Sequence, residues 1–563
     1  MGRIASLLFG LSFFALEAAR AQEPVKSFTL ADTIRGSVTP QRAWWNVLRY
    51  DIHVRPDYNK KFIRGGNAIR FQVLKPGQSM QIDLQEPMQL LSATWRKIPL
   101  KFVRQGNAFY IRFPHPLHQG SLETLDLSYD GNPRVAVRPP WDGGWIFTRD
   151  KQGRPWMSVA CQGLGASVWY PCKDDVGDEP DSGASLSITV PDTLIAVGNG
   201  RLQKKTANGD GTATYTWAVV NPINNYDIIP YIGKYVTWHE NYAGEKGKLD
   251  CDYWVLDYDL EKARKQFKQV DTMLHCFEYW MGPYPFYEDS YKLVEAPHLG
   301  MEHQSAVAYG NGFENGYLGR SYYGTPWGMK WDFIIVHESG HEWFGNSITA
   351  KDIADMWVQE GFTTYSEVLY TTCLYGTEAG NDYAVGIHGH IANDKPVIGP
   401  YGVNGEGSSD MYFKGASMLH MIRQIIGDDS VFRGLLRGLS KEFYHQTVTT
   451  GQIEQYISDF AHKDLSKIFD QYLRTIKVPV LEYKTDPNTG SLSYRWANCV
   501  KGFDMPVKAS VGRSAAEWIS PTGEWKPLAG GGANSVAPGK NMANENSLLS
   551  ADRNFYITVK KVD

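Results

Sequence analysis

The chain has 563 residues and a formal net charge of −4. Hydrophobic residues make up 42% of it and aromatic residues 13%, which excludes an intrinsically disordered protein. The length predicts about three domains. The charge balance argues against a nucleic-acid-binding protein, because such proteins carry a basic stripe.

Residues 1–21 predict a signal peptide. Arg3 supplies a short positive region, residues 4–16 an apolar run, and residues 19–21 an A-x-A cleavage site. Glu17 and Arg20 interrupt the run before the ~18–20 apolar residues of a membrane span, and no later segment is long enough. We therefore expect an exported protein, periplasmic or secreted, with no membrane insertion.

Residues 22–245 predict an antiparallel β domain. Apolar residues alternate with polar ones at period two, and Gly, Asn, Asp and Pro separate the runs without intervening helices. The clearest runs cover residues 68–73, 80–84, 108–113, 185–190, 212–219 and 235–239.

The pattern changes to helical periodicity over residues 246–476, which predict a mostly helical domain. Helical runs cover residues 260–281, 415–426, 431–443 and 451–475. Short aromatic and β-branched runs return after Val478, and residues 477–563 predict a small β-sandwich.

The most informative segment is His337-Glu338-Ser339-Gly340-His341, an H-E-x-x-H motif. The apolar run at 333–336 before it predicts the middle of a buried helix. Positions four apart share a helix face, so His337 and His341 can bind one metal ion. Glu338 would lie beside the metal, where a carboxylate can take a proton from an activated water. The alternative is a chance match within an ordinary helix.

A third protein ligand is required, and Glu360 lies nineteen residues after His341. A turn-prone stretch and then a second helical pattern separate the two residues. Two antiparallel helices joined in this way would aim Glu360 at the same metal. His, His and Glu with an open position form the ligand set of a catalytic zinc peptidase, so we expect one Zn²⁺ ion.

The sequence HESGHEWFGN, followed by WVQEGFTTYSE, resembles the gluzincin aminopeptidases of the aminopeptidase N and leukotriene A hydrolase family. The resemblance implies a multidomain α+β protein: an N-terminal antiparallel β domain, a thermolysin-like, mostly helical catalytic domain and a C-terminal β-sandwich. It also implies a short, exported, bacterial form without the large helical domain of many relatives.

Residues 299–303 resemble the family's G-x-M-E-N motif, with Leu299 and His303 in place of Gly and Asn. The resemblance implies that Gly300 and Met301 line the substrate site and that Glu302 binds the free α-amino group of a peptide. Taken alone, Glu302 would be a surface carboxylate.

Two further segments resemble family motifs that contain site residues. Tyr412-Phe413-Lys414-Gly415-Ala416 resembles Y-x-K-G-A, which implies that Tyr412 donates a hydrogen bond to the oxyanion. Gln162 matches a glutamine of the amino-end pocket, although a structural hydrogen bond explains it equally well. The glutamate expected two positions later is Leu164.

The predicted function is therefore zinc-dependent removal of N-terminal residues from peptides with a free N-terminus, by a monomer or weak oligomer. Three alternatives remain open: an endopeptidase, an epoxide hydrolase using the same site, and a non-catalytic peptide-binding relative. None of the six cysteines forms a C-x-x-C motif. In an oxidising compartment some of them could pair, and Cys161 and Cys172 are the nearest couple in sequence, but for each possible pair we favour buried free thiols.

Overall fold

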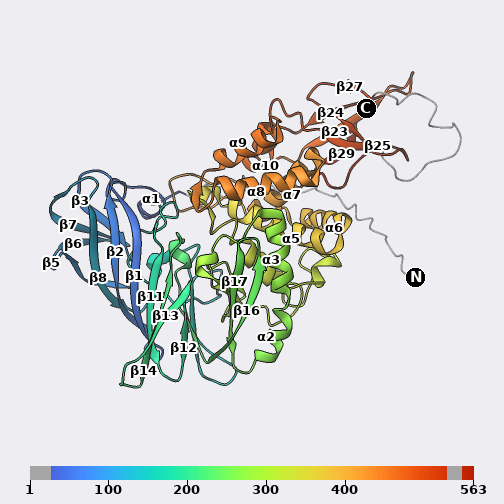
Figure 1. The fold of residues 1–563 in the computed structure, drawn as a ribbon. Coiled ribbons are helices and arrows are strands. Elements are labelled where there is room, and N and C mark those ends of the chain that lie inside the picture. The colour runs from blue at the N-terminus through green and yellow to red at the C-terminus, as the bar shows by residue number, and fades with distance from the viewer. Residues whose placement is uncertain (1–26, 529–547) are drawn as a thin grey trace, which may run out of the picture.

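The computed structural model describes residues 27–528 and 548–563. The predicted signal peptide, residues 1–21, lies outside them. From the N-terminus to the C-terminus, a β-rich part, a mostly helical part and a second, smaller β-rich part follow one another in space (Figure 1).

An eight-stranded sheet organises the N-terminal part. Its centre is β1 (Trp45–Asp57), antiparallel to β2 (Phe62–Val73) and parallel to β11 (Ala184–Pro191), so one parallel pair interrupts the expected antiparallel order. The remaining strands are β4 (Gln89–Trp95), β5 (Ile98–Pro99), β8 (Leu122–Gly131), β13 (Arg201–Ala207) and β14 (Thr212–Val219). β14 alternates buried and half-buried residues along its whole length, which is the predicted period of two.

Two smaller sheets share one hydrophobic core with the large sheet. One contains β3 (Gly77–Asp83), β6 (Lys101–Gln105) and β7 (Ala108–Leu117). The other contains β9 (Gly144–Arg149), β10 (Pro155–Ala160), β12 (Ile195–Val197) and β15 (Tyr231–Gly233). A short helix, α1 (Leu30–Gly36), precedes these strands, and a 3₁₀ turn, η2 (Asn225–Asp227), follows β14.

The central, mostly helical part begins with a five-stranded sheet in the order β16-β17-β18-β20-β19. The predicted domain boundary at 245/246 falls in the turn of its first hairpin, so β16 pairs with the central part. The strands are β16 (Tyr235–Gly244), β17 (Gly247–Leu256), β18 (Tyr291–Glu295), β19 (Gly300–Met301) and β20 (Val307–Tyr309). β19 ends the strand order, at an edge of the sheet.

Helices make up the rest of the central part, and Figure 1 shows α7 and α8 between α5 and the C-terminal strands. The predicted helical runs at 260–281 and 451–475 each form two helices; the second break occurs at His462, which has a φ of 50°. The helices are α2 (Leu260–Gln266), α3 (Gln269–Met281), α4 (Phe333–Gly340), α5 (Trp357–Tyr375), α6 (Thr377–Ile387), α7 (Asp410–Ile426), α8 (Asp429–Glu442), α9 (Thr450–Ala461) and α10 (Ser466–Arg474). β21 (Ile348–Ala350) and β22 (Gln446–Val448) form a parallel pair.

Two sheets form the described C-terminal part, at the end of the molecule away from the N-terminal sheets (Figure 1). The first contains β23 (Val480–Thr485), β24 (Leu492–Ala497), β27 (Lys526–Pro527) and β29 (Thr558–Lys561). The second contains β25 (Val507–Val511), β26 (Glu517–Ile519) and β28 (Leu549–Ala551).

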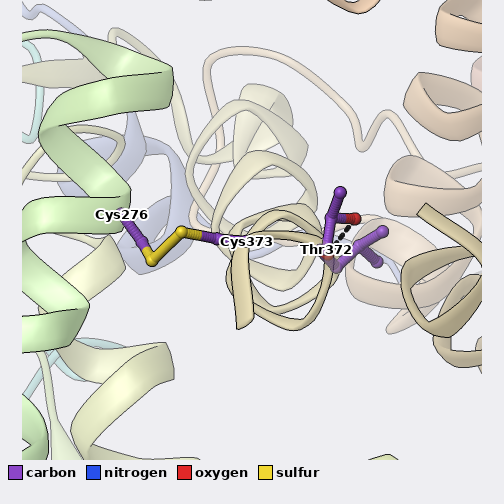
Figure 2. Close-up of a disulfide and its surroundings, with 4 residues drawn as sticks. Cys276, Thr372 and Cys373 are labelled. Carbon is purple, nitrogen blue, oxygen red and sulfur yellow. Dashed lines mark hydrogen bonds between the residues drawn. A yellow bond between two sulfur atoms is a disulfide. The ribbon is translucent and has the colours of Figure 1, made fainter. Parts of the chain in front are cut away.

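One cysteine pair contradicts the expectation of free thiols. Cys276 of α3 and Cys373 of α5 form a disulfide across a sequence separation of 97 residues (Figure 2). Packing of α3 beside α5 brings the two cysteines together, and the sequence spacing carries no sign of it. Cys161, Cys172 and Cys251 are buried free thiols, as expected. In the described part of the chain, none of the helices combines the length and the hydropathy that a membrane span requires.

Candidate active site

Helix α4 carries the H-E-x-x-H motif at its C-terminal end, and the predicted position in the middle of a helix is wrong. Asp332 caps the helix N-terminus by accepting hydrogen bonds from the backbone N–H groups of Ile334 and Ile335, at 3.1 and 3.3 Å. The helix ends at Gly340, and His341 follows with helical φ and ψ of −62° and −20°. The i, i+4 relationship therefore holds, and the two histidine rings lie 5.1 Å apart.

The chain must turn sharply after His341. Gly345 adopts a φ of +133°, and a Cβ at that position would lie 3.0 Å from His341 Nδ1. This turn leads to the second helix, α5, whose first turn contains Glu360. The end of one helix and the start of the next thus face the same point.

Three side chains converge there. Glu360 Oε2 lies 3.3 Å from His341 Nε2 and 3.9 Å from His337 Nε2. This carboxylate oxygen is buried and has no hydrogen-bond partner among the described residues. One atom of each of the three residues lies within 4.8 Å of the others. An unpaired buried carboxylate oxygen facing two imidazole nitrogens fits a zinc ion, which binds His nitrogen and carboxylate oxygen.

The second ring nitrogen of each histidine, Nδ1, contacts an oxygen atom of the protein. His337 Nδ1 lies 2.7 Å from Glu367 Oε1, and Tyr383 donates to Glu367 Oε2 at 2.7 Å. His341 Nδ1 lies 3.0 Å from the carbonyl oxygen of Phe344. These contacts orient both rings with Nε2 toward Glu360, which is how metal-binding histidines are held. Sequence reasoning missed Glu367, although it lies two helical turns after Glu360 on the same face of α5.

Glu338 lies beside this group and is buried. Burial, together with the nearby charge of Glu302, raises the pKa of the Glu338 carboxyl to about 7, although His337 and His341 act in the opposite direction. Edge strand β19 passes directly over it: a Cβ at Gly300 would lie 2.5 Å from Glu338 Oε1. Position 300 therefore requires glycine because of this close approach.

Glu302 follows β19, and two donors from the N-terminal part of the chain hold it. Gln162 Nε2 and the Tyr226 hydroxyl both donate to Glu302 Oε1, at 2.6 and 2.9 Å. Asn346 Nδ2 donates to the Glu302 backbone carbonyl at 2.8 Å. Tyr226 of η2 was not singled out from the sequence, and no local motif marks it. The arrangement leaves Glu302 Oε2 without a described donor.

Tyr412, in the first turn of α7, donates a hydrogen bond to Glu360 Oε1 at 2.9 Å. Burial and the charge of Glu360 raise the pKa of the Tyr412 phenol well above its usual value, so the phenol stays protonated and remains a donor. Its hydroxyl is thereby held beside the His–His–Glu group.

All the predicted site residues line one cavity of 530 Å³, a size typical of ligand sites. Of the three positions that depart from the family motifs, Leu299 lines it, whereas His303 and Leu164 do not. His303 is fully buried, and its Nδ1 lies 2.7 Å from the Tyr231 hydroxyl. Leu164 likewise lies outside the lining.

Comparisons with known proteins agree with this site. Residues 46–226 match the model of the peptidase M1 N-terminal domain, and residues 272–472 match the peptidase family M1 domain. Leukotriene A-4 hydrolase of Xenopus laevis is 24% identical over 410 residues, a match that covers 68% of this chain and 62% of that protein. Aminopeptidase B of Mus musculus is 22% identical over 511 residues, covering 81% and 73% of the two chains.

Among solved structures, an M1 zinc metallopeptidase variant of Deinococcus radiodurans bound to a Tyr-Ser-Ala substrate is similar, with a TM-score of 0.64 and 20% identity. The alignment covers 77% of this chain and 95% of that one. At this level of identity the likeness shows a shared fold.

A β-rich N-terminal domain is followed by a helical domain in which two histidines and a glutamate converge, and these are the two domains that the family models describe. Both halves of that architecture match family models of the same kind. The chain belongs to peptidase family M1.

Proposed function

We propose that this protein is an aminopeptidase that removes N-terminal residues from peptides. One observation carries the proposal: the Glu302 carboxylate stands next to the metal-binding group. Single ligand atoms of Glu302, Glu338 and His341 lie within 4.8 Å of one another. A carboxylate so close to the reacting centre pairs with an ammonium group one residue from the scissile bond.

The proposed metal ligands are His337, His341 and Glu360. Zinc held by them supplies a Lewis acid for the scissile carbonyl and lowers the pKa of water. Glu338 takes a proton from the attacking water and passes it to the leaving amine, a role that suits a buried carboxylate beside the His–His–Glu group. Tyr412 donates its hydrogen bond to the carbonyl oxygen as that atom gains negative charge.

Binding of the amino terminus is assigned to Glu302. Gln162 and Tyr226 both donate hydrogen bonds to its Oε1 atom, so the lone pairs of Oε2 remain available to accept from the substrate's ammonium group. Gly300 and Met301 form the wall of the cavity beside it. Relatives named aminopeptidase B and a structure with a bound Tyr-Ser-Ala peptide support a peptide substrate.

The test is hydrolysis of a panel of aminoacyl anilides beside their N-acetylated forms, by wild type and by Glu302→Ala. We expect cleavage of free anilides only, with a large loss in Glu302→Ala at unchanged zinc content. Equal cleavage of blocked peptides would contradict the amine-binding role and identify an endopeptidase. Absence of turnover on every peptide, with zinc bound, would identify a binding protein.

We also propose export, to the periplasm or the medium, as a monomer or weak oligomer. The leader-like residues 1–21 support export, and so does the Cys276–Cys373 disulfide, because disulfides persist mainly in oxidising compartments. Fractionation of cells, N-terminal sequencing of the mature protein and sedimentation velocity test the three statements separately.

A further inference from the structure

One carboxylate of the catalytic cavity has no role in the chemistry proposed above. Glu406 belongs to the loop before α7 and lines the catalytic cavity. It also lines a narrow recess adjoining that cavity, together with Gln162 and Tyr226. Because Gln162 and Tyr226 hold Glu302, this recess lies at the end of the cavity assigned to the substrate's amino terminus. A group at Glu406 is therefore placed to meet the side chain of the first substrate residue.

The Glu406 carboxylate is exposed at the cavity wall and unpaired. Among the described residues it forms no ion pair, and none donates a hydrogen bond to it. The surrounding protein removes part of the hydration of this carboxylate, and this desolvation and the charge of Glu360 raise the pKa of Glu406. The charges of Lys395 and Arg35 oppose that shift without contacting the carboxylate. An unpaired negative charge facing a ligand cavity attracts a cationic group.

The surrounding wall suits a long side chain that carries such a charge. Met356, just before α5, and Met411, in the first turn of α7, line the same cavity and are buried. Lysine and arginine place their methylene groups along apolar surface and their charged head on a carboxylate. No lysine or arginine lines the described cavity, so no residue of the described ranges 27–528 and 548–563 competes for Glu406 there.

We infer that Glu406 is a specificity-determining residue that selects peptides whose first residue is arginine or lysine. This inference rests on the proposed aminopeptidase function and names the substrate class of that site. Glu302 binds the α-ammonium, Met356 and Met411 contact the aliphatic part of the side chain, and Glu406 binds its charged end.

The experiment compares substrates that differ in charge at nearly constant shape. Arginine anilide is paired with citrulline anilide, and lysine anilide with norleucine anilide. We expect wild type to favour the charged member of each pair in kcat/KM. In Glu406→Gln the ratio of arginine to citrulline is expected to fall about 10- to 100-fold, the range for one charge-assisted hydrogen bond.

Glu261→Gln is the matched control. Glu261 is an exposed carboxylate in the first turn of α2 and lines no described cavity, so its loss should leave the ratio unchanged. A second measurement is competitive inhibition by free arginine and by free citrulline, with alanine anilide as substrate. We expect Glu406→Gln to weaken inhibition by arginine and to leave inhibition by citrulline unchanged.

The inference is overturned if wild type cleaves leucine anilide but shows no preference for arginine over citrulline. It is equally overturned if Glu406→Gln keeps the wild-type ratio. Failure to cleave any free anilide would have a different meaning: the proposed function itself would be wrong, and the inference would fail with it.

Discussion

Gly361 of α5 and Gly415 of α7 meet where the two helices cross. A Cβ at Gly415 would lie 3.1 Å from Gly361 Cα, and a Cβ at Gly361 would lie 3.3 Å from Gly415 Cα, so neither position has free room for a side chain. Glu360 precedes one of these glycines, and Tyr412 lies one turn before the other. The close crossing is what allows the Tyr412 hydroxyl to reach Glu360 Oε1 at 2.9 Å.

Gly415→Ala is therefore expected to lower kcat several-fold, because the helices must separate by a few tenths of an ångström. Gly434→Ala in α8 is the matched control: the edge of the Phe460 ring is the nearest group there, and a helical Gly→Ala change stabilises by up to about 1 kcal/mol. Steady-state kinetics and thermal melts of both variants measure the difference. A Gly415→Ala enzyme with wild-type kcat would show that the crossing does not set the Tyr412 position.

Tyr412→Phe keeps the ring and removes the hydroxyl. We expect kcat to fall about 10²- to 10³-fold, the loss typical of one oxyanion donor, with zinc content and KM close to wild type. Stopped assays on an anilide substrate and metal analysis of the purified variant provide the measurements. If KM rises while kcat is retained, Tyr412 binds substrate and does not stabilise charge in the transition state.

Glu367→Gln should weaken zinc binding, because Glu367 Oε1 holds His337 Nδ1 at 2.7 Å. The expected increase in the zinc dissociation constant is about 10- to 100-fold. Competition with a chromogenic chelator measures it directly, and zinc added back should restore activity. Glu378→Gln, which removes an exposed carboxylate paired with Arg553, is the control and should bind zinc as wild type does.

Tyr226→Phe removes one of the two donors to Glu302 Oε1 and leaves Gln162 in place. Kinetics on free anilides should show kcat/KM reduced about 10-fold, mostly through KM, because the carboxylate is less well oriented toward the ammonium group. Acetylated substrates should show no matching change. An effect on kcat alone would assign Tyr226 to another step.

Replacing Cys276 and Cys373 by alanine removes the link between α3 and α5. The expected loss is about 2–4 kcal/mol, which lowers the melting temperature of the catalytic domain by roughly 5–10 °C. A reducing agent should lower the melting temperature of wild type and leave the double variant unchanged, because only wild type contains the bond. Equal melting temperatures for the two proteins would contradict a stabilising disulfide.

The metal-binding group could be predicted from the sequence because its geometry is local. His337 and His341 are related by one helical turn, and Glu360 opens the next helix, so period and spacing suffice. Only the position of the motif within α4 was wrong, since helix ends depend on turns such as that at Gly345.

The residues that support this group could not be predicted in the same way. Tyr226 is 76 residues from Glu302, and Cys276 is 97 residues from Cys373. Contacts of this kind form only when whole domains are packed. Tyr226, Cys276 and Cys373 do not belong to a sequence motif that would indicate their contact partners. The role inferred for Glu406 could not be predicted from the sequence either, because it depends on the cavity that surrounds this residue.

The donors to the Glu302 carboxylate come from the N-terminal domain, whereas the residues proposed to bind zinc all come from the catalytic domain. Cleaving a peptide bond and recognising the end of a peptide are therefore separable properties of this molecule. A change in how the two domains meet would alter which bond of a peptide is cut before it abolished cutting, so the reaction could acquire new substrates without any change at the metal.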